Sequence, residues 1–236
     1  MFRVLFIALL FAVFGRASAA VPTSSRQVVL VTSSGWSSSR AKVRLFEKTN
    51  VGWQARGPAF DALTGRNGMA WGIGLHRRTA EGPVKKEGDG CAPAGVFRFG
   101  PVFAKDARRF DMPFVRIGPD SEGVDDSASR FYNQLVDRRK IARPDWKSSE
   151  KLFESPHYGL GIWVRHNPEA IPGAGSCIYI HDWIGRRGGT AGCTVLRRID
   201  LEKLLSALNK EKSPVLVQVP ATIARARFPE LFAGAP

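Results

Sequence analysis

Two residues near the carboxyl-terminal end of the sequence have side chains that could form a nucleophilic pair. Cys193 follows the glycine-rich segment DWIGRRGGTAG, and His181 lies twelve residues before the cysteine. The glycines allow the segment to fold back, so the thiol and the imidazole could meet. An imidazole beside a thiol forms a thiolate–imidazolium pair, and the thiolate is the reactive nucleophile. We therefore interpret Cys193 as a candidate nucleophile and His181 as its general base and acid.

Backbone and arginine groups around the cysteine could complete such a site. Gly192 has no side chain, so amide N–H groups near Ala191, Gly192 and Cys193 could point at a developing oxyanion. Nearby guanidinium groups could anchor a substrate carboxylate, although a solvated rim explains them equally well. They belong to Arg186, Arg187, Arg197 and Arg198.

A disulfide is the first alternative for Cys193. The sequence has three cysteines, which permit one bridge and leave one thiol over. If Cys193 is the free thiol, Cys91 and Cys177 could form the bridge. Cys177 is expected in the middle of a strand and could equally be a buried free thiol. The sequence leaves these choices open.

A zinc site is the second alternative, with His181, Asp182 and Cys193 as ligands and His157 or His166 added. The sequence has no close Cys or His pair of the kind that holds zinc, so this interpretation is disfavoured. Three further histidines are expected to be satisfied surface or core residues: His76, His157 and His166.

An acidic pair, Asp125 and Asp126, could bind a cation or act as acid and base. Ser127 and Ser129 follow the pair, and this composition is more typical of a capped turn.

The amino terminus has the pattern of a secretory signal peptide. Arg3 precedes the uncharged run VLFIALLFAVFG, and Ala17-Ser18-Ala19 fits a cleavage site of small residues. The run is too short to span a bilayer, which needs about twenty apolar residues. We expect residues 1–19 to be removed, residues 20–236 to form a single domain, and the mature protein to lie outside the cytoplasm without stable membrane insertion.

The 236-residue chain carries a formal net charge of +14, which includes Arg3 and Arg16 of the expected signal peptide. Without these two residues the mature charge is +12, which favours a polyanionic partner through long-range attraction. For an exported protein, anionic cell-wall polymer is a better partner than nucleic acid, which we do not expect to be bound.

Short strands separated by glycine, proline and serine dominate the expected secondary structure, so the predicted fold class is mostly β (α+β) with one or two packed helices. One helix is predicted over Leu201–Leu208 with Asp200 as its N-cap, and a second over Ser129–Val136. The expected strands are Gln27–Thr32, Ala41–Lys48, Val51–Ala55, Gly95–Phe103, Phe114–Gly118, Leu160–Arg165, Cys177–His181 and Val215–Val219.

Several blocks together resemble the L,D-transpeptidase catalytic domain, the YkuD-like fold. GSCIYIHDW (175–183) followed by TAGCTVL (190–196) resembles the motif that carries the family's histidine and cysteine. KKEGDGCAPAGVFRFG (85–100) resembles its glycine-rich entry segment. VDDSASRFYN (124–133) and WVRHNP (163–168) resemble blocks of a periplasmic branch. The similarity extends over about residues 67–219.

This resemblance implies a YkuD-like β-sandwich that remodels peptidoglycan, whose stem peptides would be the partners, and it implies no cofactor. Cys193 would attack the carbonyl of an L-centre, expel the terminal D-amino acid and form a thioester. His181 would take the thiol proton and later activate the acceptor amine of a second stem. A backbone carbonyl often orients the histidine in such sites.

The sequence departs from the commoner family pattern in two places. Thr190 and Ala191 stand before Gly192 where Ser or Thr and then His are common, and Val195 replaces an Arg or Asn after the cysteine. These changes put donor specificity in question. The expected activity is L,D-transpeptidation; hydrolysis on the same fold, as an L,D-carboxypeptidase or amide hydrolase, and non-catalytic cell-wall binding are the alternatives.

Overall fold

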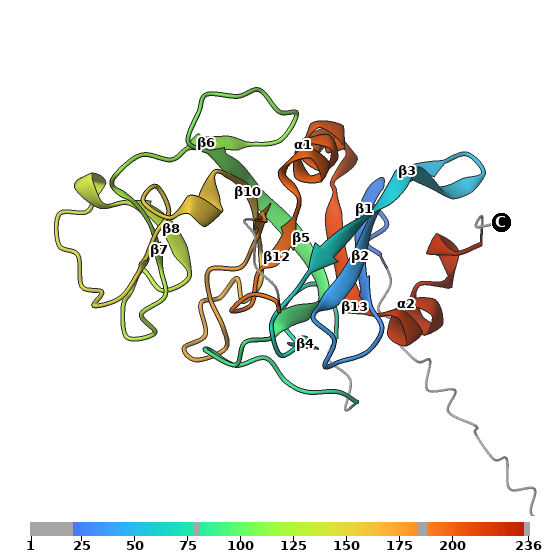
Figure 1. The fold of residues 1–236 in the computed structure, drawn as a ribbon, viewed down its shortest axis with the longest axis horizontal. Coiled ribbons are helices and arrows are strands. Elements are labelled where there is room, and N and C mark those ends of the chain that lie inside the picture. Colours follow the sequence, from blue (N-terminus) through green and yellow to red (C-terminus); the bar gives the residue numbers. More distant parts are fainter. Residues whose placement is uncertain (1–20, 78–80, 184–187, 234–236) are drawn as a thin grey trace, which may run out of the picture.

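Long strands rich in β-branched and aromatic residues build one side of the central sheet (Figure 1). The computed structural model describes residues 21–77, 81–183 and 188–233. The predicted signal peptide therefore lies outside the described residues. β1 (Gln27–Ser33) pairs antiparallel with β2 (Arg40–Thr49), which pairs antiparallel with β3 (Gly52–Leu63). The other neighbour of β1 is the parallel strand β13 (Val215–Pro220).

The sheet closes on itself through β5 (Ala92–Ala104), whose first half pairs with β13 and whose second half pairs with β10 (Leu160–Val164). From β10 the order continues through β11 (Tyr179–Asp182) and β12 (Thr194–Leu196) to β3. The strands therefore form a closed ring. Two short strands, β4 (Met69–Trp71) and β6 (Phe114–Arg116), add parallel pairs to β5.

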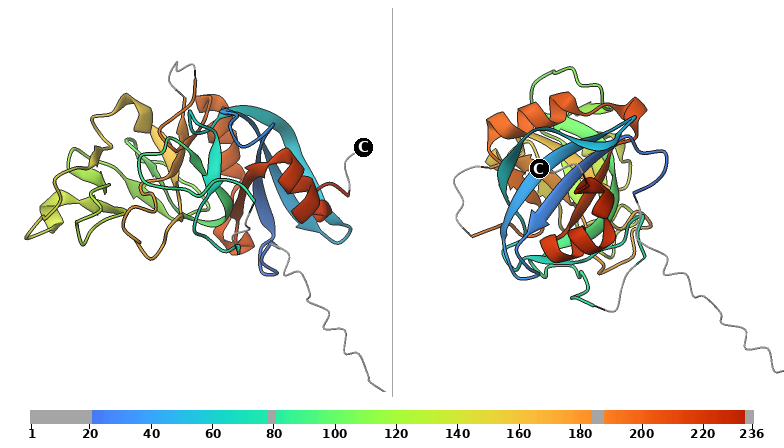
Figure 2. Two further views of the ribbon diagram at one scale, coloured as in Figure 1. Left: turned by 90° about the horizontal axis from the view of Figure 1, so that it is seen from below. Right: turned by 90° about the vertical axis from the view of Figure 1, so that its right-hand side faces the viewer.

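A second, smaller sheet lies at one end of the molecule, opposite α2 (Figures 1 and 2). It consists of β7 (Ser121–Val124), β8 (Gln134–Asp137) and β9 (Glu150–Lys151), with β7 in the middle. Gly123 of β7 lies so close to the Tyr179 hydroxyl that an added Cβ would be 2.4 Å from the oxygen. Glycine at this position thus lets the small sheet approach β11 closely.

Two α-helices pack against the ring, α1 (Arg198–Ala207) and α2 (Ala221–Arg227). Leucines at helical spacing place the buried face of α1 on the sheet, where Leu201, Leu204 and Leu205 are fully or almost fully buried. Short 3₁₀ turns cover Arg138–Lys140 (η1), Pro156–Tyr158 (η2), Lys210–Lys212 (η3) and Pro229–Leu231 (η4).

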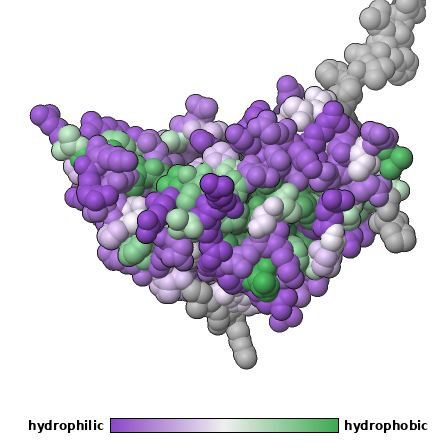
Figure 3. All heavy atoms as spheres, turned by 90° about the horizontal axis from the view of Figure 1, so that it is seen from above, coloured by the Kyte–Doolittle hydropathy of each residue, from purple (hydrophilic) through white to green (hydrophobic). Residues whose placement is uncertain are grey.

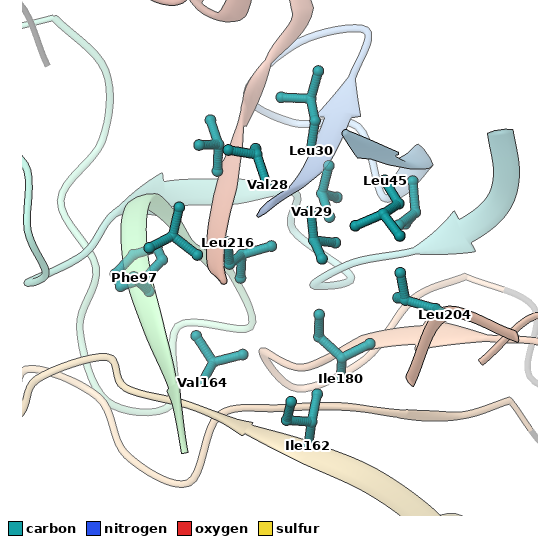
Figure 4. Packing of buried hydrophobic residues seen from close by; sticks show 14 of the residues in the cluster. Val28, Val29, Leu30, Leu45, Phe97, Ile162, Val164, Ile180, Leu204 and Leu216 are labelled. Carbon is teal, nitrogen blue, oxygen red and sulfur yellow. The ribbon is translucent and has the colours of Figure 1, made fainter. Parts of the chain in front are cut away.

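Side chains from distant parts of the sequence meet in the core of the ring (Figure 4). Leu216 of β13 lies between residues of β1 and β5 and is fully buried. The labelled residues come from β1, β2, β5, β10, β11, β13 and α1. The core therefore ties the strand that carries His181 to the strands at the amino-terminal end.

Polar side chains cover most of the face shown in Figure 3, while apolar side chains gather in a band across its middle. In the described part of the chain, the exposed large apolar residues are spread over several elements rather than joined in one patch: Val51, Leu75, Val84, Val115, Ile171 and Ile199. Among the same residues, every helix is too short or too polar to span a bilayer.

The predicted mostly-β class with packed helices is confirmed, but the helix predicted over Ser129–Val136 is wrong. Ser129 Oγ accepts a hydrogen bond from the Phe131 amide at 3.0 Å, and Asn133 has a φ of 57°. Side-chain competition for the backbone and a left-handed residue both oppose a helix. The chain instead turns and enters β8.

Two local predictions also need correction. Helix α1 begins at Arg198, so Asp200 lies in the first turn, where its carboxylate binds Arg197 Nε at 2.7 Å, and does not cap the helix. The strand expected over Cys177–His181 begins only at Tyr179 because Cys177 has a φ of 52°, which is incompatible with an extended strand.

Leu216 offers a direct test of the closed ring. Leu216→Ala leaves a cavity between β1 and β5, and we expect it to lower the free energy of unfolding by about 2–5 kcal/mol. Ile199→Ala, on the solvent-facing side of α1, should change it by about 0.5 kcal/mol or less. Urea denaturation of both variants measures the difference, and equal losses would contradict this packing.

Candidate active site

The pairing of β11 with β12 places His181 and Cys193 on one face of the sheet. The two strands run parallel, with Ile180 opposite Thr194 and His181 opposite Val195. Successive side chains of a strand point to opposite faces, so the side chains of His181, Val195 and Cys193 share one face. The sequence prediction that thiol and imidazole lie near each other agrees with this register. Both line one cavity of about 160 Å³.

A backbone carbonyl fixes the ring of His181. The Nδ1 atom lies 3.0 Å from the carbonyl oxygen of Asp182. Because a carbonyl oxygen only accepts hydrogen bonds, Nδ1 carries the proton of the neutral ring and Nε2 keeps its lone pair. The Tyr158 ring packs edge-to-face against the imidazole, with ring centroids 5.0 Å apart. The Asp182 carbonyl and the Tyr158 ring thus fix the orientation of the His181 imidazole.

The side chain of Asp182 anchors the same end of β11. Its Oδ2 atom accepts a hydrogen bond from Arg198 Nη1 at 3.0 Å, and its Oδ1 atom accepts one from the Leu160 amide at 3.4 Å. Asp182 is buried, and its ion pair with Arg198 joins β11 to α1. These contacts hold the carbonyl that orients His181.

The turn before Cys193 is closed by the side chain of Thr190. Its hydroxyl donates to the Cys193 carbonyl at 2.6 Å and accepts from the Gly192 amide at 3.1 Å. The amide of Gly192 is therefore already bound inside the turn, which differs from the prediction that it points at an oxyanion. Ala191 is exposed and lines the cavity.

Residues 64–66 support the turn from the other side. The Thr190 amide donates to the Thr64 carbonyl at 2.9 Å, and the Arg66 amide donates to the Thr190 carbonyl at 2.8 Å. Gly189, with a φ of 97°, approaches so closely that an added Cβ would lie 2.7 Å from Arg66 Cα. Glycine is required here both by the backbone angle and by the space.

Burial favours the neutral forms of the thiol and the imidazole. Desolvation raises the pKa of Cys193 far above its usual value, and the charge of Glu150 raises it further. A hydrogen bond from the Tyr179 amide and the charge of Lys85 act in the opposite direction. Desolvation lowers the pKa of His181 to about 4, although hydrogen bonding to the backbone of Asp182 and His157 opposes this. Both shifts oppose the thiolate–imidazolium pair expected from the sequence.

The Gly-Asp-Gly block brings one positive charge close to the cysteine. Asp89 accepts hydrogen bonds from Lys85 Nζ at 2.5 Å and from the amides of Lys86 and Cys91, both at 2.8 Å. The buried Lys85 Nζ atom lies 4.0 Å from the position that a Cβ on Gly192 would occupy. A positive charge behind the turn favours the ionised thiol when the proton leaves.

A carboxyl group shares the cavity with Cys193 and His181. Glu150 comes from β9 of the small sheet, and its Oε2 atom accepts a hydrogen bond from the Tyr158 hydroxyl at 2.9 Å. Burial raises the pKa of Glu150 to about 7. The sequence analysis did not single out Glu150, Tyr158 or Lys85, because each comes from a segment that is distant in sequence from the cysteine motif.

The other predicted residues fall into three groups. Arg186 and Arg187 lie outside the described residues. Arg197 is bound to Asp200 and lies away from the cavity, so the structure does not bring it to Cys193. Asp126 accepts hydrogen bonds from the amides of Ala128 and Lys147, as expected of a residue that caps a turn.

The remaining alternatives concern histidines and cysteines. His166 is a satisfied core residue, with Nδ1 accepting from the Ile73 amide at 3.2 Å and Nε2 lying 3.0 Å from the Ala174 carbonyl oxygen. Cys91, Cys177 and Cys193 are all free thiols. In residues 21–77, 81–183 and 188–233, no three His, Cys, Asp or Glu side chains gather in a way that could hold a metal ion.

Comparison with known proteins gives one weak structural likeness. The chain is similar to the structure of Bdellovibrio bacteriovorus Bd1075, with 15% sequence identity and a TM-score of 0.42. The likeness covers 88% of this chain and 55% of that chain, so the present chain spans about half the length of that protein. No family model and no curated protein matches the chain. We infer neither fold nor function from this likeness.

The neutral resting pair predicts slow alkylation of Cys193. The raised pKa keeps the thiol protonated at neutral pH, so its reaction with iodoacetamide should be slower at about pH 7.5 than that of a free cysteine and should still increase above about pH 9. Peptide mass spectrometry separates Cys193 from Cys91 and Cys177. A rate that reaches its plateau below about pH 8 would show a resting thiolate instead.

Thr190 should be needed for the shape of the turn and not for the fold. Thr190→Val keeps the volume but removes both hydroxyl hydrogen bonds, and we expect about a tenfold or greater loss of the turnover that depends on Cys193. Thr190→Ser restores the hydroxyl and should recover most of it. Full activity of Thr190→Val with an unchanged melting temperature would show that the hydroxyl is dispensable.

Proposed function

We propose that the protein is a cysteine acyltransferase of peptidoglycan that acts as a periplasmic L,D-transpeptidase. The observation that carries the proposal is the shared face of β11 and β12, where a neutral imidazole held at Nδ1 by the Asp182 carbonyl and the Cys193 thiol line one cavity. The resemblance of residues 175–183 and 190–196 to the L,D-transpeptidase motif supplies the substrate class. The expected mature charge of +12, without Arg3 and Arg16, suits an anionic wall polymer.

The first half of the reaction forms a thioester. His181 Nε2 takes the thiol proton as Cys193 Sγ attacks the carbonyl carbon at the L-centre of a donor stem. The resulting imidazolium then gives this proton to the leaving nitrogen when the bond to the terminal D-amino acid breaks. Because proton transfer accompanies attack, the reaction does not require a stable thiolate in the resting enzyme. The positive charge of Lys85 stabilises the anionic sulfur during this step.

The second half transfers the acyl group to an amine. The acceptor nitrogen attacks the thioester carbon, gives a proton to His181 and displaces the sulfur, which recovers the proton from the imidazolium. The chemical energy comes from the donor amide, so no cofactor enters the reaction. The amide of Cys193 immediately precedes β12, and it is the backbone donor that we assign to the oxyanion in place of Gly192.

Product analysis tests the proposal. The mature protein, incubated with tetrapeptide-stem muropeptides, should release D-alanine and form dimers detectable by mass spectrometry. Cys193→Ala and His181→Ala should each reduce product formation at least about a thousandfold. Cys91→Ser serves as the matched control, since Cys91 lies outside the cavity, and it should retain activity.

Each other result has a defined meaning. Shortened monomers without dimers would replace transpeptidation by L,D-carboxypeptidase activity on the same pair. Equal products from the wild type and Cys193→Ala would remove the cysteine from the chemistry and contradict the proposal.

A further inference from the structure

Glu150 has no role in the proton transfers described above, although its carboxyl group lies in the same cavity as Cys193. Its strand, β9, pairs with β7 so that Glu150 stands opposite Gly123, the residue that lies against the Tyr179 hydroxyl. The small sheet therefore delivers this carboxyl group to the wall of the cavity. The other acidic residue of the described lining, Asp182, is already paired with Arg198.

Glu150 is half-buried, and few groups compensate for its partial removal from water. The Tyr158 hydroxyl is its hydrogen-bond donor, and among the described residues no Lys or Arg forms an ion pair with it. By contrast, Glu122 of the same small sheet is buried and bound by Lys151, Trp146 and Ser149. Partial removal of a carboxylate from water without a cationic partner costs free energy, which an incoming cation would offset.

Further acceptors lie near Glu150. Removal from water is the main cause that raises the pKa of Glu150, and the charges of Asp125 and Glu87 raise it further. The hydrogen bond from Tyr158 opposes these effects. Glu87 accepts hydrogen bonds from the Tyr132 hydroxyl and, at 2.8 Å, from Ser176 Oγ. In contrast, Asp125 Oδ1 is buried without a hydrogen-bond partner. The Tyr179 hydroxyl is also fully buried without a partner. The negative charges of Asp125 and Glu87 therefore add to the attraction of Glu150 for a positively charged hydrogen-bond donor.

We infer that Glu150 is a cation subsite that binds an ammonium group of the stem peptide beside Cys193. The inference rests on the proposed function for the identity of the peptide, and on the shared cavity for the place of binding. A primary amine is protonated at neutral pH and supplies both the charge and the hydrogen bonds that this carboxylate lacks. Among residues 21–77, 81–183 and 188–233, the cavity lining includes no Lys or Arg that would compete for Glu150.

Binding of an ammonium group would also affect the cysteine. The negative charge of Glu150 raises the pKa of Cys193, so a cation bound to Glu150 reduces this opposition to ionisation. The substrate would thereby ease the loss of the proton from its own nucleophile. A purely structural Glu150, acting only by holding Tyr158 against His181, would not discriminate between charged and neutral peptides.

The pH dependence follows from the ionised form of Glu150. The groups that act on it are the phenols of Tyr158 and Tyr179, the thiols of Cys193 and Cys177, and the carboxyl groups of Asp125 and Glu87. None of these supplies a cation at neutral pH, while His181, with a pKa of about 4, is neutral. As the pH falls through about 7, Glu150 becomes protonated, and ammonium binding should weaken.

The experiment measures binding without chemistry. In the Cys193→Ala protein at about pH 8, where Glu150 is ionised, isothermal titration calorimetry compares a stem tetrapeptide that has a free side-chain amine with the same peptide acetylated at that amine. Acetylation should weaken binding about tenfold or more. When Glu150→Gln is added, the free-amine peptide should bind as weakly as the acetylated one, because the amide keeps the shape and the acceptor for Tyr158 but lacks the charge.

Two controls separate charge from structure. Glu211→Gln removes an exposed carboxylate far from the cavity, and Tyr158→Phe removes the hydrogen bond to Glu150 but leaves its charge; both should preserve the effect of acetylation. The melting temperature of each variant reports whether it is folded.

An effect of acetylation that is equal with and without the Glu150→Gln substitution, or no effect in the Cys193→Ala protein, would overturn the subsite. The readout needs no turnover, so it stands apart from the proposed function. A wild type that forms neither dimers nor shortened stems would refute the acyltransferase, whereas unequal binding of the two peptides would still support the cation subsite.

Discussion

The parallel pairing of β11 with β12 is the constraint on which the site depends. It joins two segments separated by a glycine-rich connection, and its register puts His181 and Cys193 on the same face. Parallel pairing requires a crossover between the strands, and the turn closed by Thr190 ends that crossover at the cysteine. The closed ring supports the pair on both sides, through β10 next to β11 and β3 next to β12.

Burial then determines the electrostatics of the pair. Desolvation favours the neutral thiol and the neutral imidazole, so in the proposed reaction proton transfer between them accompanies attack on the substrate. Two charged groups act on the thiol in opposite directions, with Lys85 behind the turn and Glu150 in the cavity. Asp89 of the Gly-Asp-Gly loop holds Lys85 in place, and Glu150 belongs to the small sheet. The chemistry of the cysteine therefore depends on two elements that lie outside its own motif.

Local patterns predicted the fold class and most central strands, since these depend on strand composition. The predicted pairing of His181 with Cys193 stays a prediction, to which the structure adds a shared face and a shared cavity. Local patterns failed where tertiary contacts determine the conformation of a segment. The Ser129–Val136 segment forms turns and a strand that pairs with β7 in place of the predicted helix. The Gly192 amide donates its hydrogen bond to the Thr190 hydroxyl and not to an oxyanion. Glu150 could not be found from the sequence because its place in the cavity requires the small sheet to pack against the ring.

The most direct test of the central claim is the intact mass of the protein, quenched in acid during turnover of a tetrapeptide stem. The account predicts an added mass equal to the stem without its terminal D-alanine, located on Cys193 by peptide mapping and absent from Cys193→Ala. No adduct under conditions in which product accumulates, or an adduct on another residue, would contradict it.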